Sequence, residues 1–142
     1  MGQLPNVFGS GGLISAMEDL RRRTGDTVMV GLRQGVHVRL IFSLRGPRSM
    51  TIHYPVGILL PVCRSAVGKI LLAGLPNSGI LRTARSANEQ VQPQDKVSNG
   101  ELMAEIVQIC ERGRASSMDY PQMDRATLAV ALPAMPGSLP WR

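Results

Sequence analysis

The chain has 142 residues, of which 44% are hydrophobic, 4% aromatic and 18% charged, and its formal net charge is +6. This length and composition predict one globular domain with an aliphatic core. No apolar run approaches the ~20 residues that cross a bilayer, and no basic stretch leads into an apolar secretory signal, so we expect a cytoplasmic protein without membrane association.

The positive charge invites a nucleic-acid interpretation, which the distribution of the charges disfavours. The one dense cluster, Arg21-Arg22-Arg23, ends a predicted helix, where cations complement the helix dipole. No helix-turn-helix, zinc finger or aromatic-interleaved basic patch is present. The cluster therefore indicates a solvated helix end.

The N-terminal half predicts a helix followed by strands. Residues 1–12 form a lead-in, and residues 13–142 form the domain. Apolar residues at helical spacing predict a helix from about Ser10 that stops at Gly25. Strands over 27–32 and 36–43 form a β-hairpin, and a third strand covers 50–54.

The C-terminal half predicts mainly helices. An extended approach to Pro61 leads into a helix over 65–75, a short helix covers 77–85, and a polar surface loop covers 86–97. Ser98 and Glu101 have the spacing of a capping box, so they start a helix that ends at Gly113. A fourth strand covers 126–132. This order predicts an α+β fold with a mainly antiparallel sheet.

Enzyme motifs fail when their spacing is tested. Gly68-Lys69 lacks both the earlier glycine and the following hydroxyl of a phosphate-binding loop. Cys63 with His37 or His53 as base leaves open a small hydrolase or transferase. The two cysteines, Cys63 and Cys110, have no metal-ligand spacing and suggest no disulfide framework. No metal and no cofactor are predicted.

Three stretches resemble one known family. The first is Thr24-Gly25-Asp26-Thr27 before the hairpin. The second supplies Gly57, Pro61, Ser65-Ala66, Gly68-Lys69 and Leu71-Leu72-Ala73, and the third runs from Gly113-Arg114-Ala115 to the strand before Pro133. In this order they resemble the effector-binding domain of IclR-family bacterial transcription regulators.

The resemblance implies a GAF-like domain, an antiparallel sheet flanked by helices, that is not an enzyme. It implies that a small metabolite, often a carboxylate, binds and alters how an attached winged-helix domain holds DNA. It also implies a homodimer or homotetramer. We expect DNA contact only through that winged-helix domain, which is absent from this chain, as is the family's final strand. A GAF-like oligomerisation module with a filled pocket stays open as an alternative.

The resemblance also implies the binding residues. Ser65 caps its helix, and the small Ala66 and Val67 would let a ligand approach the first turn. Ser117 aligns where the family often has Asp, and Thr127 where it often has Cys, which favours a less polar effector such as an aromatic or medium-chain acid. Candidates for the opposite wall are Met29, Leu40, Phe42, Ile52 and Tyr54.

Overall fold

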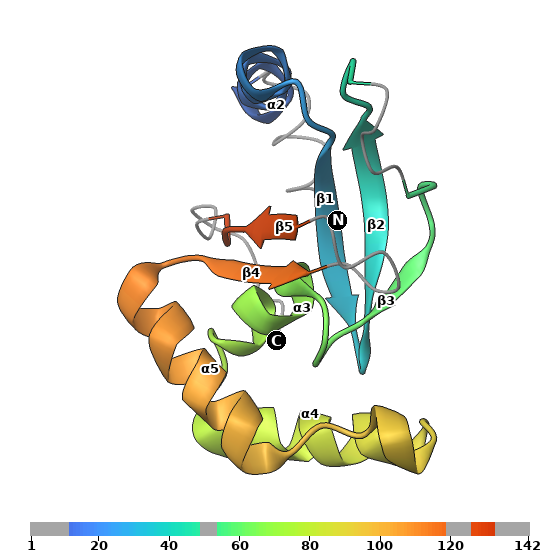
Figure 1. The fold of residues 1–142 in the computed structure, drawn as a ribbon, viewed down its shortest axis with the longest axis vertical. Coiled ribbons are helices and arrows are strands. Elements are labelled where there is room, and N and C mark those ends of the chain that lie inside the picture. Colours follow the sequence, from blue (N-terminus) through green and yellow to red (C-terminus); the bar gives the residue numbers. More distant parts are fainter. Residues whose placement is uncertain (1–11, 49–53, 119–125, 133–142) are drawn as a thin grey trace. The chain divides into compact units, whose positions relative to one another are not determined.

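The computed structural model describes residues 12–48, 54–118 and 126–132 (Figure 1). It divides into two compact units. The N-terminal unit has residues 12–30, 40–48 and 54–58 of the described part, and the core unit has residues 31–39, 59–118 and 126–132. The strands β1 and β2 contribute residues to both units.

The N-terminal unit begins with the predicted helix, α2 (Gly12–Thr24), which buries Met17. Helical spacing places Leu20 on the same apolar stripe as Met17, but Leu20 is 50% exposed. Gly25 ends the helix in the left-handed conformation (φ 76°), and its N–H donates to Arg21 O at 2.8 Å. The Thr27 hydroxyl then accepts from Gly46 N–H at 3.0 Å, which joins the segment after α2 to the end of β2.

The predicted hairpin consists of β1 (Val28–Gln34) and β2 (His37–Leu44), joined through Gly35 at φ 62°. A third strand, β3 (Leu59–Pro61), pairs antiparallel with β2, with Val38 opposite Leu60. Here the sequence predicts only an extended approach to Pro61. The strand predicted over 50–54 lies outside the described residues except for Tyr54, which is not in a strand.

The helices of the core unit are α3 (Ala66–Leu72), α4 (Asn77–Glu89) and α5 (Asn99–Arg112). The boundaries of α5 confirm the prediction: the Ser98 hydroxyl accepts from Glu101 N–H, and Gly113 ends the helix at φ 74°. The loop predicted over 86–97 is partly wrong. α4 continues to Glu89 and a 3₁₀ turn covers Pro93–Asp95, because the Asn88 amide bonds both Val97 N–H (2.9 Å) and Val97 O (3.0 Å) and holds the connection tight.

Two further strands complete the core unit. The strand β4 (Ala115–Met118) pairs antiparallel with β5 (Ala126–Ala129). The sequence does not predict β4, because its small Ala-Ser-Ser residues have low strand propensity. β5 is shorter than the predicted strand over 126–132. The α+β class with antiparallel sheets is confirmed.

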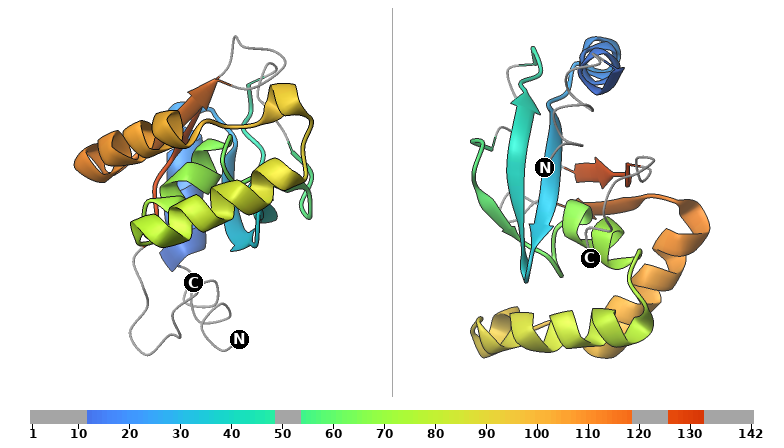
Figure 2. Two further views of the ribbon diagram at one scale, coloured as in Figure 1. Left: turned by 90° about the horizontal axis from the view of Figure 1, so that it is seen from below. Right: turned by 180° about the vertical axis from the view of Figure 1, so that it is seen from behind.

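One hydrophobic cluster holds the core unit together. Figures 1 and 2 show α3 in the middle of the core unit, with β4 on one side and α4 and α5 on the other. Because α3 is packed between these elements, it buries four of its seven residues and exposes none fully. The buried helical members are Ala66, Ile70, Leu72, Ile80, Ala84, Leu102, Ile106 and Ile109.

Candidate functional site

The start of α3 is fixed by hydrogen bonds within its own segment. Ser65 has extended backbone (φ −84°, ψ 150°), and its hydroxyl accepts from Gly68 N–H at 3.1 Å. The same hydroxyl donates to Pro61 O at 2.7 Å, and Ser65 N–H donates to that carbonyl at 3.1 Å. The predicted cap is therefore confirmed, and Pro61 and Ser65 form one closed turn.

Gly68 allows this turn to pack against the chain that precedes it. A Cβ on Gly68 would lie 2.1 Å from Val62 O, so only glycine fits. Ala66 is only 1% exposed and belongs to the hydrophobic cluster, whereas Ser65 and Val67 are half-buried. The Ala66 side chain thus packs in the core, and Ser65 and Val67 carry the accessible part of the turn.

Ser117 and Thr127 lie directly opposite each other in the β4–β5 ladder. Residues two apart share a face of a strand, so Ser117 lies on the face of buried Ala115, and Thr127 on the face of half-buried Ala129. The helix α3 contacts both strands. The five predicted residues Ser65, Ala66, Val67, Ser117 and Thr127 therefore all belong to the core unit.

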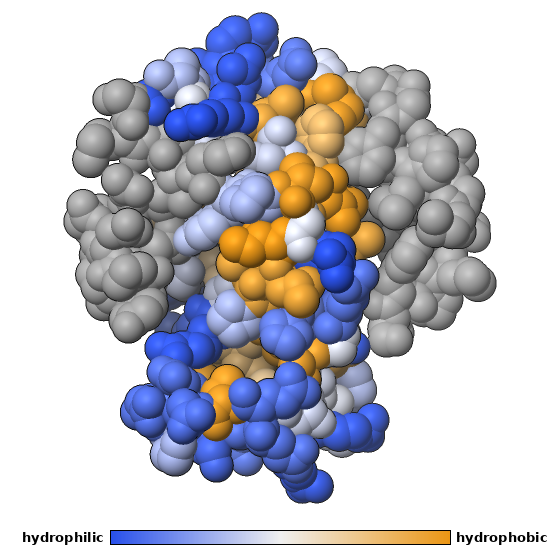
Figure 3. Space-filling view, turned by 90° about the vertical axis from the view of Figure 1, so that its right-hand side faces the viewer, coloured by the Kyte–Doolittle hydropathy of each residue, from blue (hydrophilic) through white to orange (hydrophobic). Residues whose placement is uncertain are grey.

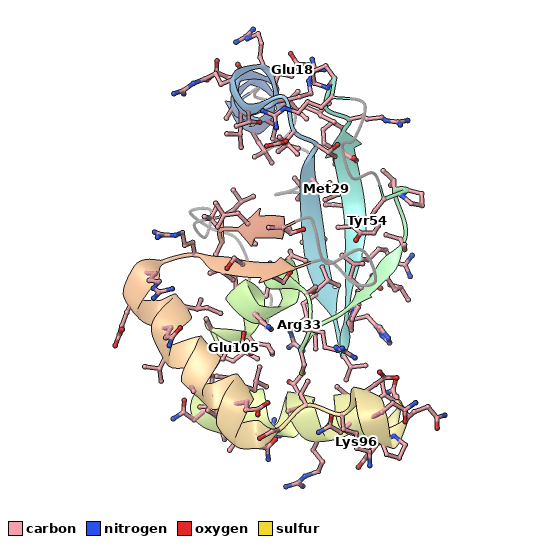
Figure 4. The ribbon with its side chains drawn as sticks, viewed as in Figure 1. Glu18, Met29, Arg33, Tyr54, Lys96 and Glu105 are labelled. Atoms are coloured by element: carbon pink, nitrogen blue, oxygen red, sulfur yellow. The ribbon has the colours of Figure 1, made fainter. Side chains whose placement is uncertain are left out.

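The predicted opposite wall belongs to the N-terminal unit. Met29 on β1, Phe42 on β2 and Tyr54 are half-buried, and Leu40 is buried. Figure 4 labels Met29 and Tyr54. Ile52 lies outside the described residues. That these residues line a pocket remains a prediction.

A hollow of about 410 Å³ lies in the core unit next to Ser117. Its charged lining comes from Arg64, Lys69 and Glu105, and its hydroxyls come from Ser116 and Ser117. Cys63 and Val97 form the rest of the lining. A smaller hollow of about 140 Å³ shares Cys63, Arg64, Val97 and Glu105 with it.

Two ion pairs border the hollow. Lys69 Nζ on α3 lies 2.7 Å from Glu105 Oε2 on α5, and Arg64 lies 3.2 Å from Asp95. The Lys69 side chain is only 12% exposed, whereas both members of the Arg64 pair are about half exposed. Figure 4 shows Glu105 on the side of α5 toward α3. Sequence analysis missed this pairing because 36 residues separate the partners.

Cys63 is buried in the wall of the hollow, and Cys110 is exposed. Burial raises the pKa of the Cys63 thiol, and the nearby Lys69 charge opposes that effect only in part. Over the residues that the structure describes, no three His, Cys, Asp or Glu side chains gather into a possible metal site. In the same residues, no helix has the length and apolarity to cross a membrane.

These features define an α+β domain with hydroxyl side chains beside a capped helix start. The chain matches the family described as Bacterial transcriptional regulator IclR C-terminal over residues 14–136. It therefore belongs to the IclR family of bacterial transcriptional regulators, as part of their C-terminal effector domain.

Individual relatives agree with this assignment. The HTH-type transcriptional regulator XynR of Escherichia coli is 27% identical over 118 residues, which cover 82% of this chain and 46% of XynR. The effector domain of the transcriptional regulator IclR from Acinetobacter has TM-score 0.71 and 24% identity, covering 80% of this chain and 66% of that chain. The chain spans less than half the length of the curated relatives it matches.

One structural neighbour was solved with a ligand. It is an IclR homolog from Microbacterium hydrocarbonoxydans complexed with 4-hydroxybenzoate, with TM-score 0.69 and 17% identity. The match covers 85% of this chain and 50% of the neighbour's chain. At this identity the likeness is one of fold.

Proposed function

We propose that this domain senses a small organic acid for an IclR-type transcription regulator and thereby modulates DNA binding by an attached winged-helix domain. The observation that carries the proposal is the pairing of Ser117 with Thr127 on one face of β4–β5, in strands that contact α3. Two hydroxyls beside a half-buried, serine-capped turn supply donors for a carboxylate.

The chemistry of these positions supports an acid with an apolar body. Neither Ser117 nor Thr127 carries a charge, so neither repels an anion, and Val67 and Ala129 add apolar surface to the same unit. The Microbacterium neighbour, whose fold is similar, was solved in complex with 4-hydroxybenzoate, an aromatic acid, which supports this choice. An aromatic or medium-chain carboxylate is the effector class we propose.

A thermal-shift screen with aliphatic and aromatic carboxylates tests this proposal. A ligand present at ~100 times its Kd stabilises the folded state by ~2.7 kcal/mol. Thr127→Val, which removes a hydroxyl and keeps the side-chain volume, should abolish the shift. Thr83→Val on α4 is the matched control, because the Thr83 hydroxyl donates to Gly79 O of its own helix at 2.8 Å. Equal shifts in the two variants would contradict the proposed site.

The rival function is a hydrolase or transferase that uses Cys63 as nucleophile. A nucleophilic cysteine needs an exposed thiolate, whereas Cys63 is buried and burial raises its pKa. Iodoacetamide at pH 8 should therefore modify the exposed Cys110 first and Cys63 only when the chain unfolds. Rapid modification of Cys63 in the folded chain would favour the enzyme.

The proposed function also includes an oligomeric state. We expect a cytoplasmic homodimer or homotetramer that reaches DNA only through the winged-helix domain. Leu128, on the face of β5 opposite Thr127, is 66% exposed, and Val130, just after the strand, is 63% exposed; both are apolar surface that a second copy could cover. A monodisperse monomer in light scattering would contradict this expectation.

A further inference from the structure

The hollow in the core unit has a polar lining unlike that of the proposed effector site. Of its seven lining residues, five carry a charge or a hydroxyl, and only Cys63 and Val97 have neither. Pockets for apolar ligands are lined mainly by hydrophobic side chains. A ligand of this hollow must therefore be polar itself.

Lys69 is the strongest binding group in the hollow. Its ammonium has three N–H donors, and its side chain is only 12% exposed. Within the described ranges, the structure gives this ammonium one hydrogen-bond partner, Glu105 Oε2 at 2.7 Å. A largely desolvated cation with spare donors favours an additional anionic acceptor.

Glu105 limits how strongly an anion can bind. Its carboxylate occupies one donor of Lys69 and repels a second negative charge. At the same time it can accept hydrogen bonds from ligand hydroxyls, as can Ser116 and Ser117. The lining thus suits one carboxylate together with several hydroxyl groups.

We propose that this hollow is a second ligand site, in which Lys69 binds the carboxylate of a small hydroxylated acid while Glu105 and Ser116 bind its hydroxyls. This site adjoins the proposed effector site at Ser117, which lines the hollow, but its own binding groups are Lys69, Glu105 and Ser116, whereas the proposed effector has an apolar body. The two sites therefore select acids of opposite polarity. Glu105 sets the affinity, because it competes for the same ammonium.

The probe is gluconate, titrated into the 142-residue chain by calorimetry at an ionic strength of ~0.15 M, where surface charges are screened beyond about 8 Å. Sorbitol keeps the hydroxyls without the charge, and acetate keeps the charge without the hydroxyls. We expect gluconate to bind more tightly than either. Lys69→Met should weaken it about tenfold or more, since a charge-assisted hydrogen bond is lost.

Glu105→Gln provides the decisive variant, because it should tighten gluconate binding severalfold and a gain cannot come from misfolding. Arg82→Met is the matched control: it removes one cation from the exposed surface of α4, whose face in the lower part of Figure 3 is mainly hydrophilic. Its affinity should equal that of the parent chain.

Three results would overturn the proposal. They are no gluconate binding by the parent chain, binding that Lys69→Met leaves intact, and equal losses in Lys69→Met and Arg82→Met. Loss in Thr127→Val with retention in Lys69→Met would place gluconate at the proposed effector site instead. If no carboxylate in the thermal-shift screen depends on Thr127 but gluconate binding depends on Lys69, the proposed effector site is wrong and the second site stands.

Discussion

The two units of the molecule are stabilised in different ways. In the core unit, α3, α4 and α5 share one buried cluster with residues of the strands, and α3 buries four of its seven residues. In the described part of the N-terminal unit, only Met17 and Leu40 are buried hydrophobic residues, and the ion pairs of Asp19 and Asp26 lie on the surface. Buried apolar area dominates stability and surface pairs add little, so the core unit should be the more stable region.

The comparison is tested most severely by Leu72→Ala. Leu72 is 0% exposed within the cluster, and truncating a buried leucine costs about 2–5 kcal/mol. Leu20→Ala in the N-terminal unit is the control, because Leu20 is 50% exposed and its loss should stay within ~1 kcal/mol. Urea denaturation of both variants measures the difference. Equal losses would contradict the proposed division.

The next largest effect is expected for Gly68→Ala. The added Cβ would overlap the Val62 carbonyl, so α3 must move away from the segment before it. Overpacking of this kind costs about 1–3 kcal/mol. Gly100→Ala in α5 is the matched control, since its Cβ would meet only the Ser98 hydroxyl at 3.8 Å. There the substitution should be neutral or stabilising, by up to ~1 kcal/mol.

A smaller effect separates the two serine caps. Ser65→Ala removes both the bond from Gly68 N–H and the bond to Pro61 O, whereas Ser98→Ala removes one long bond of 3.4 Å from Glu101 N–H. Cap substitutions cost about 0.5–2 kcal/mol. Ser65→Ala should fall in the upper half of that range and Ser98→Ala in the lower half. Thermal unfolding of the two variants would show the reverse order if Ser65 were needed only for a ligand.

These caps show which part of the structure the sequence predicts. A cap, a stop glycine or an amphipathic helix depends on residues within one or two turns, so Ser65, Ser98 and Gly113 are where sequence analysis expects them. The strand β4 depends on its partner β5, and the 3₁₀ turn depends on Asn88 reaching Val97. Such non-local causes leave little trace in a short window of sequence.

The same distinction applies to the candidate sites. The resemblance to a family supplied Ser117 and Thr127, and the strand register then placed them opposite each other. Nothing local indicates that Lys69 on α3 meets Glu105 on α5, because helical periodicity orients a side chain without naming its partner. The polar hollow is therefore a finding of the structure.

The smallest effect concerns the surface ion pairs of the N-terminal unit. Arg22 lowers the pKa of the Asp19 carboxyl through a 2.8 Å hydrogen bond and its charge, and Arg23 adds a weaker contribution. A depressed pKa contributes stability that is present above the unfolded-state pKa and is lost as the pH falls through the folded-state value. Because the Arg22 side chain is 72% exposed and that of Asp19 is 48% exposed, salt should screen most of their interaction. An NMR titration of Asp19 should show its pKa rising toward the usual range in ~1 M salt, where the screening length is about 3 Å. The pKa should rise in the same direction in Arg22→Gln. A pKa unchanged by both would contradict the assignment of its shift to the two arginine side chains, whose ion pairs would then contribute nothing to the stability of the N-terminal unit.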